Sequence, residues 1–429
     1  MSSLNGHPPD TERFAVETTP AIDLAERYCA HNYDPSPVVL VRGKGVWLWD
    51  EQGRKYLDMM SAYSAVSHGH AHPRLVRALA EQARKVAVFS RNFHSEKLGP
   101  LAQKLCRLTG QEMMLPMNSG AEAVETAIKA ARKWAYAVKG VPSERAEIIA
   151  CEGNFHGRTT TAVGMSSVAR YKDGFGPFAP GFRLIPYGDA AALEAAIGPH
   201  TAAFLVEPIQ GEGGIVVPPA GYLAACASIC KRARVLLIRD EIQTGLGRTG
   251  KFLACEHDGV KPDGLTLGKA LGGGLLAVSA FLASREVMQV FSPGEHGSTF
   301  GGNALACAAA LQALDVLFEE NLVERSAEMG RHLLQGLAAI ESPLIREVRG
   351  RGLLIGVEID PAIAGAKTVC DRLLERGVLT KESRETVIRF APPLVIGREE
   401  IDWAVARIRA VMEEIGMFPT RSSQVSQAG

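Results

Sequence analysis

The stretch VLLIRDE, residues 235–241, decides the fold class of this 429-residue chain. It is a compact apolar run that ends in charged residues. Similar runs occur elsewhere: EIIAC at 147–151, AAFLVE at 202–207 and GLTLG at 264–268. Segments with helical periodicity, such as residues 124–135, alternate with these runs. Compact apolar strands that alternate with helices predict an α/β fold with a mainly parallel sheet covered on both faces.

The composition is that of an ordinary globular chain. Its length predicts about two to three domain-sized units, and a hydrophobic content of 46% is enough for a substantial core. The 47 lysine and arginine residues are balanced by 47 aspartate and glutamate residues, so no charge excess favours nucleic acid or an anionic membrane surface. We therefore expect small-molecule chemistry.

The cysteines and the amino terminus indicate a compartment. The eight cysteines are scattered without a C-x-x-C pair, which favours a reducing compartment over a disulfide framework. Cys226 and Cys230 lie one helical turn apart, but no second pair completes a zinc site, so core packing is the better interpretation. Residues 1–20 lack the apolar segment of a signal peptide, and no apolar run approaches the length of a membrane span. We expect a soluble, cytoplasmic protein.

Both ends of the chain differ from the middle in the spacing of their apolar residues. The stretch VWLWDEQGRKYLDMM at 46–60 predicts a hairpin with EQGR as its turn. Past residue 310, long helical patterns surround strand candidates and predict a smaller α+β domain. These helical patterns are 310–320 and 401–414, and the strand candidates are 353–359 and 386–391. The final residues 421–429 are expected to fray.

Three chemically active residues follow apolar runs. In open α/β sheets ligands bind at the carboxyl ends of the strands, and Glu207, Asp240 and Lys269 stand at such ends. A lysine there is either a surface residue on a turn or a desolvated, nucleophilic amine. A carboxylate at the end of a buried strand needs a cationic partner, and a protonated pyridine nitrogen fits Asp240. Lys269 and Asp240 therefore suit the lysine and the acid that hold pyridoxal phosphate.

Two glycine-rich segments could hold the phosphate of such a cofactor. In MNSGAEAVETAIKAARKW, Ser119 and Gly120 open a periodic helix whose free N–H groups favour an anion. Ser119 and Glu122 also form an ordinary capping-box pattern, and both interpretations can hold together. The second segment, HGSTFGGN, supplies the hydroxyl groups of Ser298 and Thr299.

Two other patterns favour different ligands. Gly272, Gly274 and Ala277 match the looser dinucleotide fingerprint G-x-G-x-x-A, but the following VSAFLA is typical of a strand and not of the required helix. The segment HGHAHP places three histidines, at positions 68, 70 and 72, on alternate residues before Pro73. Without a nearby acid or cysteine, a loop or helix-entry role is favoured over a metal site.

Taken together, these residues resemble the class III pyridoxal-phosphate aminotransferases, and within that class the branch that acts on ornithine. The matching motifs run in order between about residues 31 and 410. They are SAYSAV, MNSGAEAVETAIKAARKW, NFHGRT, DGFGPFAPGF, VEPIQGEGGIVVP, DEIQTGLGRTG, LGKALGGG, PGEHGSTFGGN and VIRFAPPLVI.

The resemblance implies a fold-type I homodimer whose active sites are shared between subunits. It implies a large cofactor-binding domain at 61–310 and a small domain built from 1–60 and 311–429. Lys269 would form the Schiff base and Asp240 would hold the pyridinium. The other implied cofactor contacts are Gln243 near the ring hydroxyl, Phe155 stacked on the ring, Ser119, Gly120 and Ala121 at the phosphate, and Ser298 and Thr299 reaching it from the other subunit.

The same resemblance implies how two unlike substrates share one site. The implied substrate residues are Tyr33, Tyr63, Arg158, Glu212 and Arg389. Glu212 would neutralise Arg389 until the carboxylate of glutamate displaces it, because an unpaired buried arginine is costly. Arg158 would hold the far carboxylate of either substrate.

The implied reaction converts L-ornithine and 2-oxoglutarate to glutamate 5-semialdehyde and glutamate. In that reaction Lys269 would move the proton between the substrate carbon and C4′ of the cofactor. Alternative donors within the class are acetylornithine, lysine and 4-aminobutyrate, and Tyr63 favours ornithine because it can narrow the site. Racemisation or decarboxylation on the same fold, and a non-catalytic relative, are further alternatives; an intact Lys269 speaks against the last.

Four positions depart from the family pattern. Arg239 stands where a small residue is usual, so it must find an acid, reach solvent or strain its strand. Leu276 and Ala277 replace an aromatic-proline pair, which predicts a less rigid loop. His68 replaces a glutamine and is expected near the substrate tyrosine.

Overall fold

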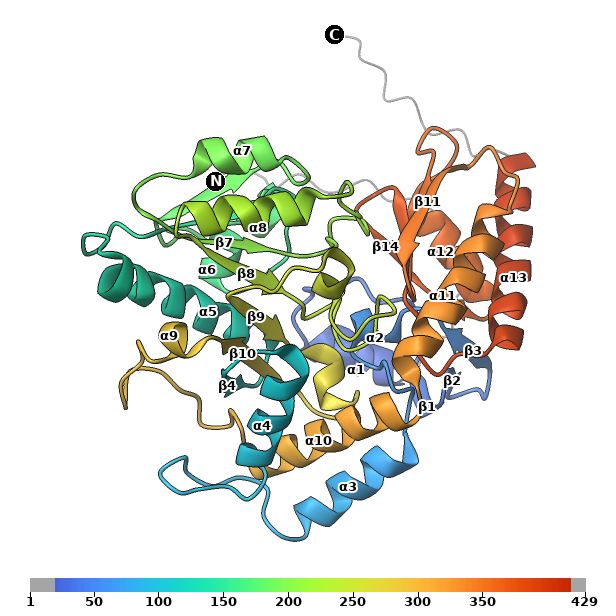
Figure 1. The fold of residues 1–429 in the computed structure, drawn as a ribbon. Coiled ribbons are helices and arrows are strands. Elements are labelled where there is room, and N and C mark those ends of the chain that lie inside the picture. Colours follow the sequence, from blue (N-terminus) through green and yellow to red (C-terminus); the bar gives the residue numbers. More distant parts are fainter. Residues whose placement is uncertain (1–19, 418–429) are drawn as a thin grey trace, which may run out of the picture.

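The computed structural model describes residues 20–417, and its largest feature is a seven-stranded sheet of order β4-β10-β9-β8-β7-β5-β6 (Figure 1). Neighbouring strands from β9 to β6 are parallel, whereas β10 runs antiparallel to both β9 and β4. The predicted α/β class with a mainly parallel sheet is confirmed. The strands are β4 Met113–Met117, β5 Glu147–Cys151, β6 Phe182–Ile185, β7 Thr201–Val206, β8 Leu236–Asp240, β9 Gly264–Leu267 and β10 Ser279–Ala283.

The central strands coincide with the apolar runs of the sequence. β5 matches the run 147–151, and the bounds of β7, β8 and β9 lie within one residue of the other three runs. Every residue of β7, β8 and β9 is buried, because helices cover both faces of the sheet. The stretch VSAFLA contains β10, so the helix that a dinucleotide fingerprint requires is absent at this place in the described chain.

Alternate residues of each central strand pack against different helices. Along β8, Leu236 and Ile238 join the apolar cluster of α5 (Gly120–Trp134), and Leu237 joins the cluster on the other face. That other face is covered by α7 (Ala190–Ala196) and α8 (Tyr222–Arg232). Because side chains alternate between faces, Asp240 falls on the α5 face and Arg239 on the α8 face. Cys226 and Cys230 of α8 are 0% and 1% exposed, which confirms their packing role.

The two edge strands are the ones that the sequence patterns did not predict. β4 contains Pro116, which lacks an N–H group and is tolerated at a sheet edge. Its first three residues are only half-buried, so it shows no continuous apolar run. β6 occupies the opposite edge and has four residues, one of them exposed.

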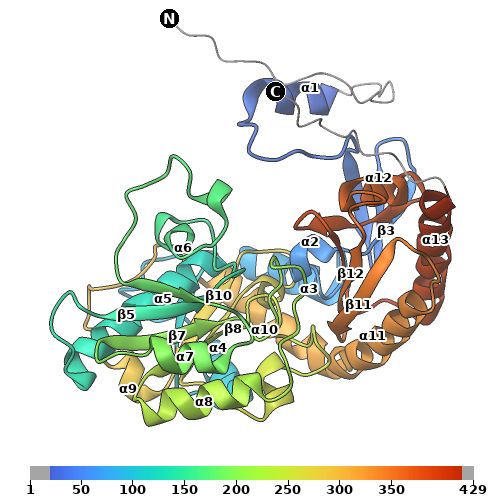
Figure 2. The ribbon, with the colours of Figure 1, turned by 90° about the horizontal axis from the view of Figure 1, so that it is seen from above.

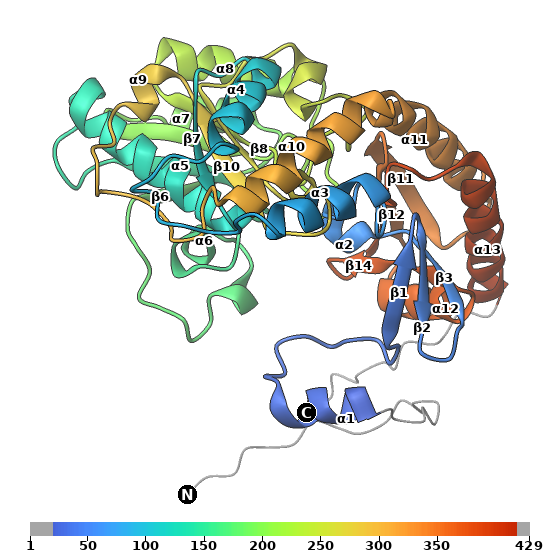
Figure 3. The same ribbon diagram turned by 90° about the horizontal axis from the view of Figure 1, so that it is seen from below.

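Further helices lie around the large sheet, and α3, α4 and α10 gather on one side of it (Figure 3). Their bounds are α2 Ser61–Ser64, α3 Pro73–Ala83, α4 Leu98–Thr109, α6 Thr160–Gly164, α9 Arg285–Met288 and α10 Ala304–Glu319. Short helical turns are η1 Ala135–Lys139, η2 Ala169–Tyr171, η3 Ala254–Asp258 and η4 Lys269–Gly272.

A second group of elements combines the two ends of the described chain. One small sheet has the order β1-β2-β3-β13, and in it β13 pairs in parallel with β3, more than 300 residues away. A second small sheet has the order β11-β12-β15-β14. The predicted hairpin is present as β2 and β3, and both strand candidates past residue 310 are present as β12 and β15.

The elements of this group are β1 Leu40–Lys44, β2 Trp47–Asp50, β3 Lys55–Asp58, β11 Ile345–Arg351, β12 Leu354–Ile359, β13 Val378–Leu379, β14 Lys381–Ser383, β15 Val387–Phe390, α11 Leu322–Ala338, α12 Ala366–Glu375 and α13 Arg398–Met417. α11 and α13 pack against each other. The predicted helical pattern at 310–320 forms the carboxyl-terminal part of α10, and the pattern at 401–414 lies within α13. The expected fraying at 421–429 lies outside the described residues.

The first described helix, α1 (Pro20–Tyr28), stands apart from the rest of the chain (Figure 2). None of its residues is buried, and the segment that joins it to β1 is exposed over nearly all its length. Between residues 20 and 417, no helix combines the length and the apolar character needed to cross a membrane.

Candidate active site

The candidate site lies at the carboxyl ends of the parallel strands, on the face covered by α5. Glu207 follows β7, Asp240 ends β8 and Thr266 lies in β9, and these three strands are neighbours in the sheet. Asp240 pairs in register with Thr266, whose hydroxyl donates to the Asp240 Oδ1 atom at 3.1 Å. The alternation of side chains therefore brings polar groups from adjacent strands to one edge.

Asp240 is held by a buried histidine that the sequence patterns had not singled out. The Nδ1 atom of His156 lies 2.7 Å from Asp240 Oδ2, and the two side chains are 0% and 4% exposed. Burial alone would lower the pKa of His156, but its hydrogen bond with Asp240 and the nearby Glu207 charge raise it above the ordinary value. The buried contact with His156 fixes the orientation of the Asp240 carboxylate.

Glu207 completes this buried polar group. Its carboxyl oxygens accept hydrogen bonds from the backbone N–H groups of Phe155 at 3.0 Å and Gly211 at 3.2 Å. Burial raises the pKa of Glu207 to about 7, and the charge of His156 offsets part of that rise. Glu207 thus ties the loop before α6 to the end of β7.

Lys269 stands two residues past β9, on a strained backbone. Its φ is +45°, a left-handed conformation that costs free energy for a residue with a Cβ atom. Desolvation lowers the pKa of its amine to about 8, although the nearby Glu212 carboxylate acts in the opposite direction. Its Nζ atom makes no hydrogen bond or ion pair with any residue in the described range 20–417. A free, easily deprotonated amine therefore lies beside Asp240 and Glu212.

The start of α5 has the expected capping box. Ser119 Oγ accepts from the N–H of Glu122 at 3.3 Å, and the Glu122 carboxylate accepts from the Ser119 N–H at 2.7 Å. The N–H groups of Gly120 and Ala121 are the first of the helix and have no acceptor four residues earlier. A Cβ atom on Gly157 would come within 2.9 Å of the Ala121 Cβ atom, so the loop that carries His156 packs on this helix start.

The other glycine-rich turn lies beside the same helix start. Ser298 Oγ accepts from Asn118 Nδ2 of the same chain at 2.7 Å, and Thr299 is exposed. Within a single chain, the Ser298 hydroxyl thus lies beside the α5 terminus, and Thr299 faces solvent.

Arg389 is a fully buried cation with unused donors. It lies in β15, is 1% exposed, and its Nη1 atom donates to Glu212 Oε1 at 2.6 Å and to Gln243 Oε1 at 3.2 Å. Its Nε and Nη2 atoms have no partner within residues 20–417. Burial would raise the pKa of Glu212, but the adjacent Arg389 charge holds it below the ordinary value. The two unpartnered nitrogens of Arg389 can donate to a further anion.

Two tyrosines stand next to this ion pair. The guanidinium of Arg389 lies 4.5 Å from the centroid of the Tyr63 ring. Burial and the Glu212 charge raise the pKa of Tyr63, and Tyr33 is close enough to contribute to that rise. Tyr33 itself is 75% exposed, because it belongs to the arm that follows α1.

Arg158 and Phe155 are neighbours on the loop between β5 and α6. The Arg158 guanidinium lies 3.7 Å from the centroid of the Tyr171 ring and 5.5 Å from that of Phe155. Arg158 is exposed and makes no ion pair with the carboxylates of residues 20–417. Tyr171 was not predicted from the sequence, since no motif marks it.

Arg239 was expected to find an acid, to reach solvent or to strain its strand, and the structure shows none of these outcomes. It is 0% exposed, and its Nε, Nη1 and Nη2 atoms all lack a hydrogen-bond partner among the described residues. Glu241 is an acid on which its charge acts, and the Glu241 carboxylate already accepts from Thr244, Ala254 and Cys255. Arg239 therefore neither reaches solvent nor forms an ion pair, while β8 keeps a regular register with both neighbours.

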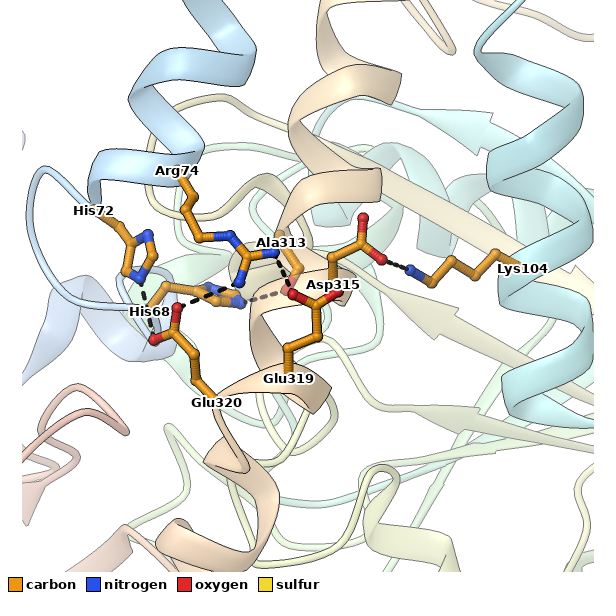
Figure 4. Close-up of polar contacts among 8 residues, drawn as sticks. All are labelled: His68, His72, Arg74, Lys104, Ala313, Asp315, Glu319 and Glu320. Atoms are coloured by element: carbon orange, nitrogen blue, oxygen red, sulfur yellow. Dashed lines mark hydrogen bonds and ion pairs between the residues drawn. The ribbon is translucent and has the colours of Figure 1, made fainter.

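His68 makes its hydrogen bond away from the candidate site residues, and its expected place near the substrate tyrosine stays a prediction. Its Nε2 atom bonds to the Ala313 carbonyl of α10 at 2.9 Å, and burial lowers its pKa to about 4 (Figure 4). His72 points to Glu320 at 3.2 Å, beside the Arg74–Glu319 pair. His70 bonds to Asp58 at 2.7 Å.

The three histidines thus diverge to separate partners, and the segment forms a loop that leads into α3, with His72 at the helix N-cap position. No group of three or more His, Cys, Asp or Glu side chains within residues 20–417 is arranged to hold a metal ion. In the loop that departs from the family pattern, Leu276 packs against the main apolar cluster and Ala277 is exposed.

Comparison with known proteins places these features in context. A family model described as aminotransferase class-III matches residues 28–412. The ornithine aminotransferase of Halalkalibacterium halodurans is 58% identical over 396 residues, which are 92% of this chain and 99% of that protein.

Solved structures agree with this match. The ornithine aminotransferase of Toxoplasma gondii superposes with a TM-score of 0.91 at 45% identity and covers 92% of this chain and 94% of its own. The acetylornithine aminotransferase of Elizabethkingia anophelis has a TM-score of 0.84 at 48% identity and covers 92% of this chain and 98% of its own.

Proposed function

Because the chain belongs to the class III aminotransferases, a family of fold-type I pyridoxal-phosphate enzymes, we propose that it transfers the δ-amino group of L-ornithine to 2-oxoglutarate. The products are glutamate 5-semialdehyde and glutamate. The observation that carries the proposal is 58% identity to an ornithine aminotransferase over nearly the whole of both chains. Within the site, the Arg389–Glu212 pair supports it, because this pair suits two substrates of unlike charge.

The residues present fit pyridoxal phosphate. Lys269 offers an unpartnered amine with a pKa of about 8, and Asp240 offers a buried carboxylate held by His156. The start of α5 offers free N–H groups to a phosphate. When bound, the cofactor supplies an electron sink for the charge that develops at the substrate carbon. The residues proposed to hold it are Lys269, Asp240, Gln243, Phe155, Ser119, Gly120, Ala121, Ser298 and Thr299.

Lys269 and Asp240 have distinct tasks in this proposal. The Nζ atom of Lys269 takes the proton from the substrate carbon that bears the reacting amine, and a lowered pKa leaves enough of it in the basic form near neutral pH. Asp240 stabilises a positive charge on the pyridine nitrogen, and His156 and Thr266 hold the carboxylate in place. His156 and Thr266 thus act through Asp240.

Glu212 and Arg389 provide the choice between substrates. Ornithine presents an uncharged carbon beside its reacting amine, so Arg389 keeps its bond to Glu212 while ornithine is bound. Glutamate presents a carboxylate there, and the unpartnered Nε and Nη2 atoms of Arg389 can bind it when Glu212 moves away. Arg158, which has no acidic partner within residues 20–417, binds the distal carboxylate. Tyr63 and Tyr33 form the opposite wall of the proposed substrate site.

A homodimer with shared active sites is part of the proposal. Large apolar side chains are exposed on two loops near the α5 terminus, among them Phe93 at 71% and Phe300 at 57%. Hydrogen bonds from Arg91 to Gly301 and from Leu305 to Ala87 join these loops. A second copy would cover this surface and the α1 arm, and would bring Ser298 and Thr299 to the partner's phosphate site.

The proposed domain division is 61–310 for the large domain, with 1–60 and 311–429 forming the small one. The parallel pairing of β13 with β3 supports the joining of both ends. We also propose that the protein is cytoplasmic, which is where a protein with eight unpaired, mostly buried cysteines is stable.

The test is a parallel assay of the purified protein with 2-oxoglutarate and L-ornithine, N-acetylornithine, L-lysine or 4-aminobutyrate. The expected result is that ornithine is the preferred donor. Its product, glutamate 5-semialdehyde, is detected as the cyclised form, pyrroline carboxylate. N-acetylornithine is the strongest alternative donor, since a solved acetylornithine aminotransferase is 48% identical, and a preference for it would refute the ornithine assignment. In the same preparation, Lys269→Ala should lose the visible absorbance of lysine-linked cofactor, and an unchanged spectrum would refute the role of Lys269.

A further inference from the structure

The segment that carries Tyr63 has an unusual backbone. The residues of α2, Ser61–Ser64, have φ values of +44°, +47°, +60° and +74°, so the turn winds left-handed. None of them is glycine, and each Cβ atom crowds the following carbonyl oxygen in this conformation. Such a run persists only when surrounding contacts over-determine it. The position of Tyr63 beside Arg389 therefore depends on whatever holds this turn.

The turn is fixed at its start by Asp58. The Oδ1 atom of Asp58 accepts from the N–H groups of Met60 at 2.9 Å and Ser61 at 2.7 Å, and its Oδ2 atom bonds to His70 at 2.7 Å. At its end, Ser67 Oγ donates to the Ser64 carbonyl at 3.0 Å.

Arg248 bonds to both ends of the same turn. Its Nη2 atom donates to Ser61 Oγ at 3.2 Å and to Ser67 Oγ at 2.8 Å. Arg248 is 0% exposed and forms no ion pair among residues 20–417, so all its acceptors are neutral. The Asp58 carboxylate acts on this cation electrostatically but forms no ion pair with it, so the hydrogen bonds to neutral acceptors hold the buried guanidinium in place.

The second terminal nitrogen of the Arg248 guanidinium, Nη1, reaches the segment that follows the strand of Arg389. The Nη1 atom donates to the carbonyl groups of Leu353 at 2.9 Å and Pro392 at 2.6 Å. Ser61 Oγ also donates to the Ala391 carbonyl at 2.6 Å. Ala391 and Pro392 directly follow β15, so Arg248 connects the backbone that bears Tyr63 to the backbone that bears Arg389.

We propose that Arg248 is a positioning residue for the ω-amine substrate, because it sets the contact between Tyr63 and Arg389. This inference rests on the proposed dual-substrate function. Tyr63 narrows the site while Arg389 is paired with Glu212, so a misplaced Tyr63 impairs the ornithine half-reaction more than the glutamate half-reaction. A lysine cannot replace Arg248, since one ammonium cannot span acceptors on both backbones as a planar guanidinium does.

The experiment measures kcat and KM of both half-reactions for Arg248→Lys. The expected result is a fall of about tenfold in the ornithine-to-glutamate ratio of kcat/KM, the size of one lost hydrogen bond to a charged group. The change should lie mainly in the KM for ornithine. In a Tyr63→Ala background, Arg248→Lys should leave the ratio unchanged, because Tyr63 carries the effect. An equal fall in both half-reactions, or a further fall of the ratio in that background, would overturn the proposal.

Milder variants keep the test decisive if Arg248→Lys does not fold. Ser67→Ala removes one acceptor of the guanidinium and should lower the same ratio. Ser326→Ala is the matched control, because the buried Ser326 hydroxyl donates to the backbone carbonyl of Arg248 at 2.9 Å and not to the guanidinium. It should leave the ratio unchanged, and equal effects of the two serine variants would overturn the proposal.

A measurement without cofactor or substrate adds an independent readout. Hydrogen exchange of the amides of residues 60–69 in the cofactor-free protein should quicken in Ser67→Ala and not in Ser326→Ala. Equal exchange rates in both variants would contradict the proposed role of Arg248 in holding the turn Ser61–Ser64. If the wild-type protein prefers another ω-amine donor, the ornithine assignment fails, and the Arg248 proposal is judged by the ratio for that donor against glutamate.

Discussion

At the scale of one residue, the proposed choice between substrates rests on the electrostatic environment of Arg389. Its guanidinium is buried, one of its nitrogens is paired with Glu212, and two others have no partner within residues 20–417. Removing the carboxylate would leave the cation unpaired whenever ornithine is bound, and the cost of a buried unpaired charge is several kcal/mol. The carboxylate of glutamate would meet the same cation without a competitor.

Glu212→Ala is therefore expected to shift the preference toward substrates with an α-amino group. The kcat/KM for ornithine should fall by at least about tenfold, whereas that for glutamate should be maintained or rise. Single-turnover kinetics of each half-reaction measure both values. Glu212→Gln, which keeps the size and removes the charge, should behave in the same direction. An unaltered preference in both variants would remove Glu212 as the switch.

The amine of Lys269 gives a second prediction at the residue scale. Its pKa of about 8 means that the neutral, nucleophilic form becomes dominant above that pH. The rate at which the cofactor-free protein captures pyridoxal phosphate should rise with pH and level off above about 8. A simple lysine derivative, with its ordinary pKa, should show a rate that continues to rise toward pH 10. A protein profile that parallels the free amine would show that Lys269 is not desolvated.

At the scale of one element, β8 combines two charged residues with opposite environments. Asp240 faces α5, where His156 and Thr266 bond to it, and Arg239 faces α8, where apolar side chains and cysteines surround it. The alternation of the strand makes this division unavoidable, because consecutive side chains point to opposite faces. Arg239 is thus a destabilising residue that the strand tolerates.

Arg239→Met is expected to raise the free energy of unfolding by about 1–3 kcal/mol, because it removes an unpartnered buried charge and keeps most of the volume. Urea denaturation of the cofactor-free protein at pH 7 measures the change. Arg248→Met is the matched control, since Arg248 is equally buried but makes four hydrogen bonds, and its loss should destabilise the fold. A destabilised Arg239→Met would mean that Glu241 or bound water compensates the charge.

At the scale of the whole molecule, one chain leaves some residues of the proposed site exposed to solvent. Tyr33 and Thr299 are exposed, and the loops of Phe93 and Phe300 present exposed apolar side chains. α1 has no buried residue and stands apart from the other elements (Figure 2). Large exposed apolar side chains on adjoining loops favour an interface at this place. Assembly and activity should therefore depend on each other.

The protein is expected to sediment as a dimer, with twice the chain mass of 45.9 kDa. The double variant Phe93→Asp and Phe300→Asp should dissociate it and lose ornithine activity together. Val138→Asp is the control: Val138 is 38% exposed in η1, at the far end of α5 from the site, and the variant should stay dimeric and active. A fully active monomer in the double variant would refute the shared site.

The central strands and the opening of α5 could be predicted from the sequence alone. Continuous apolar runs, helical periodicity and the Ser119–Glu122 capping box are local signals, and local propensity suffices to read them. Residues that directly follow apolar runs are expected at the carboxyl ends of strands, so Asp240 and Lys269 could be expected at the ends of neighbouring strands. The edge strands escaped, because Pro116 and partial exposure erase the apolar pattern of β4.

The contacts that tune the site were decided only by the tertiary structure. His156 meets Asp240 across 84 residues, and Arg248 joins Ser61 to Pro392 across more than 300. The left-handed turn at Ser61–Ser64 contradicts the backbone preference of its residues, and the unpartnered burial of Arg239 contradicts the polarity of its side chain. No local sequence pattern could therefore predict either feature. Periodicity determines which face of an element a residue occupies, but packing between distant segments determines which side chain it meets there.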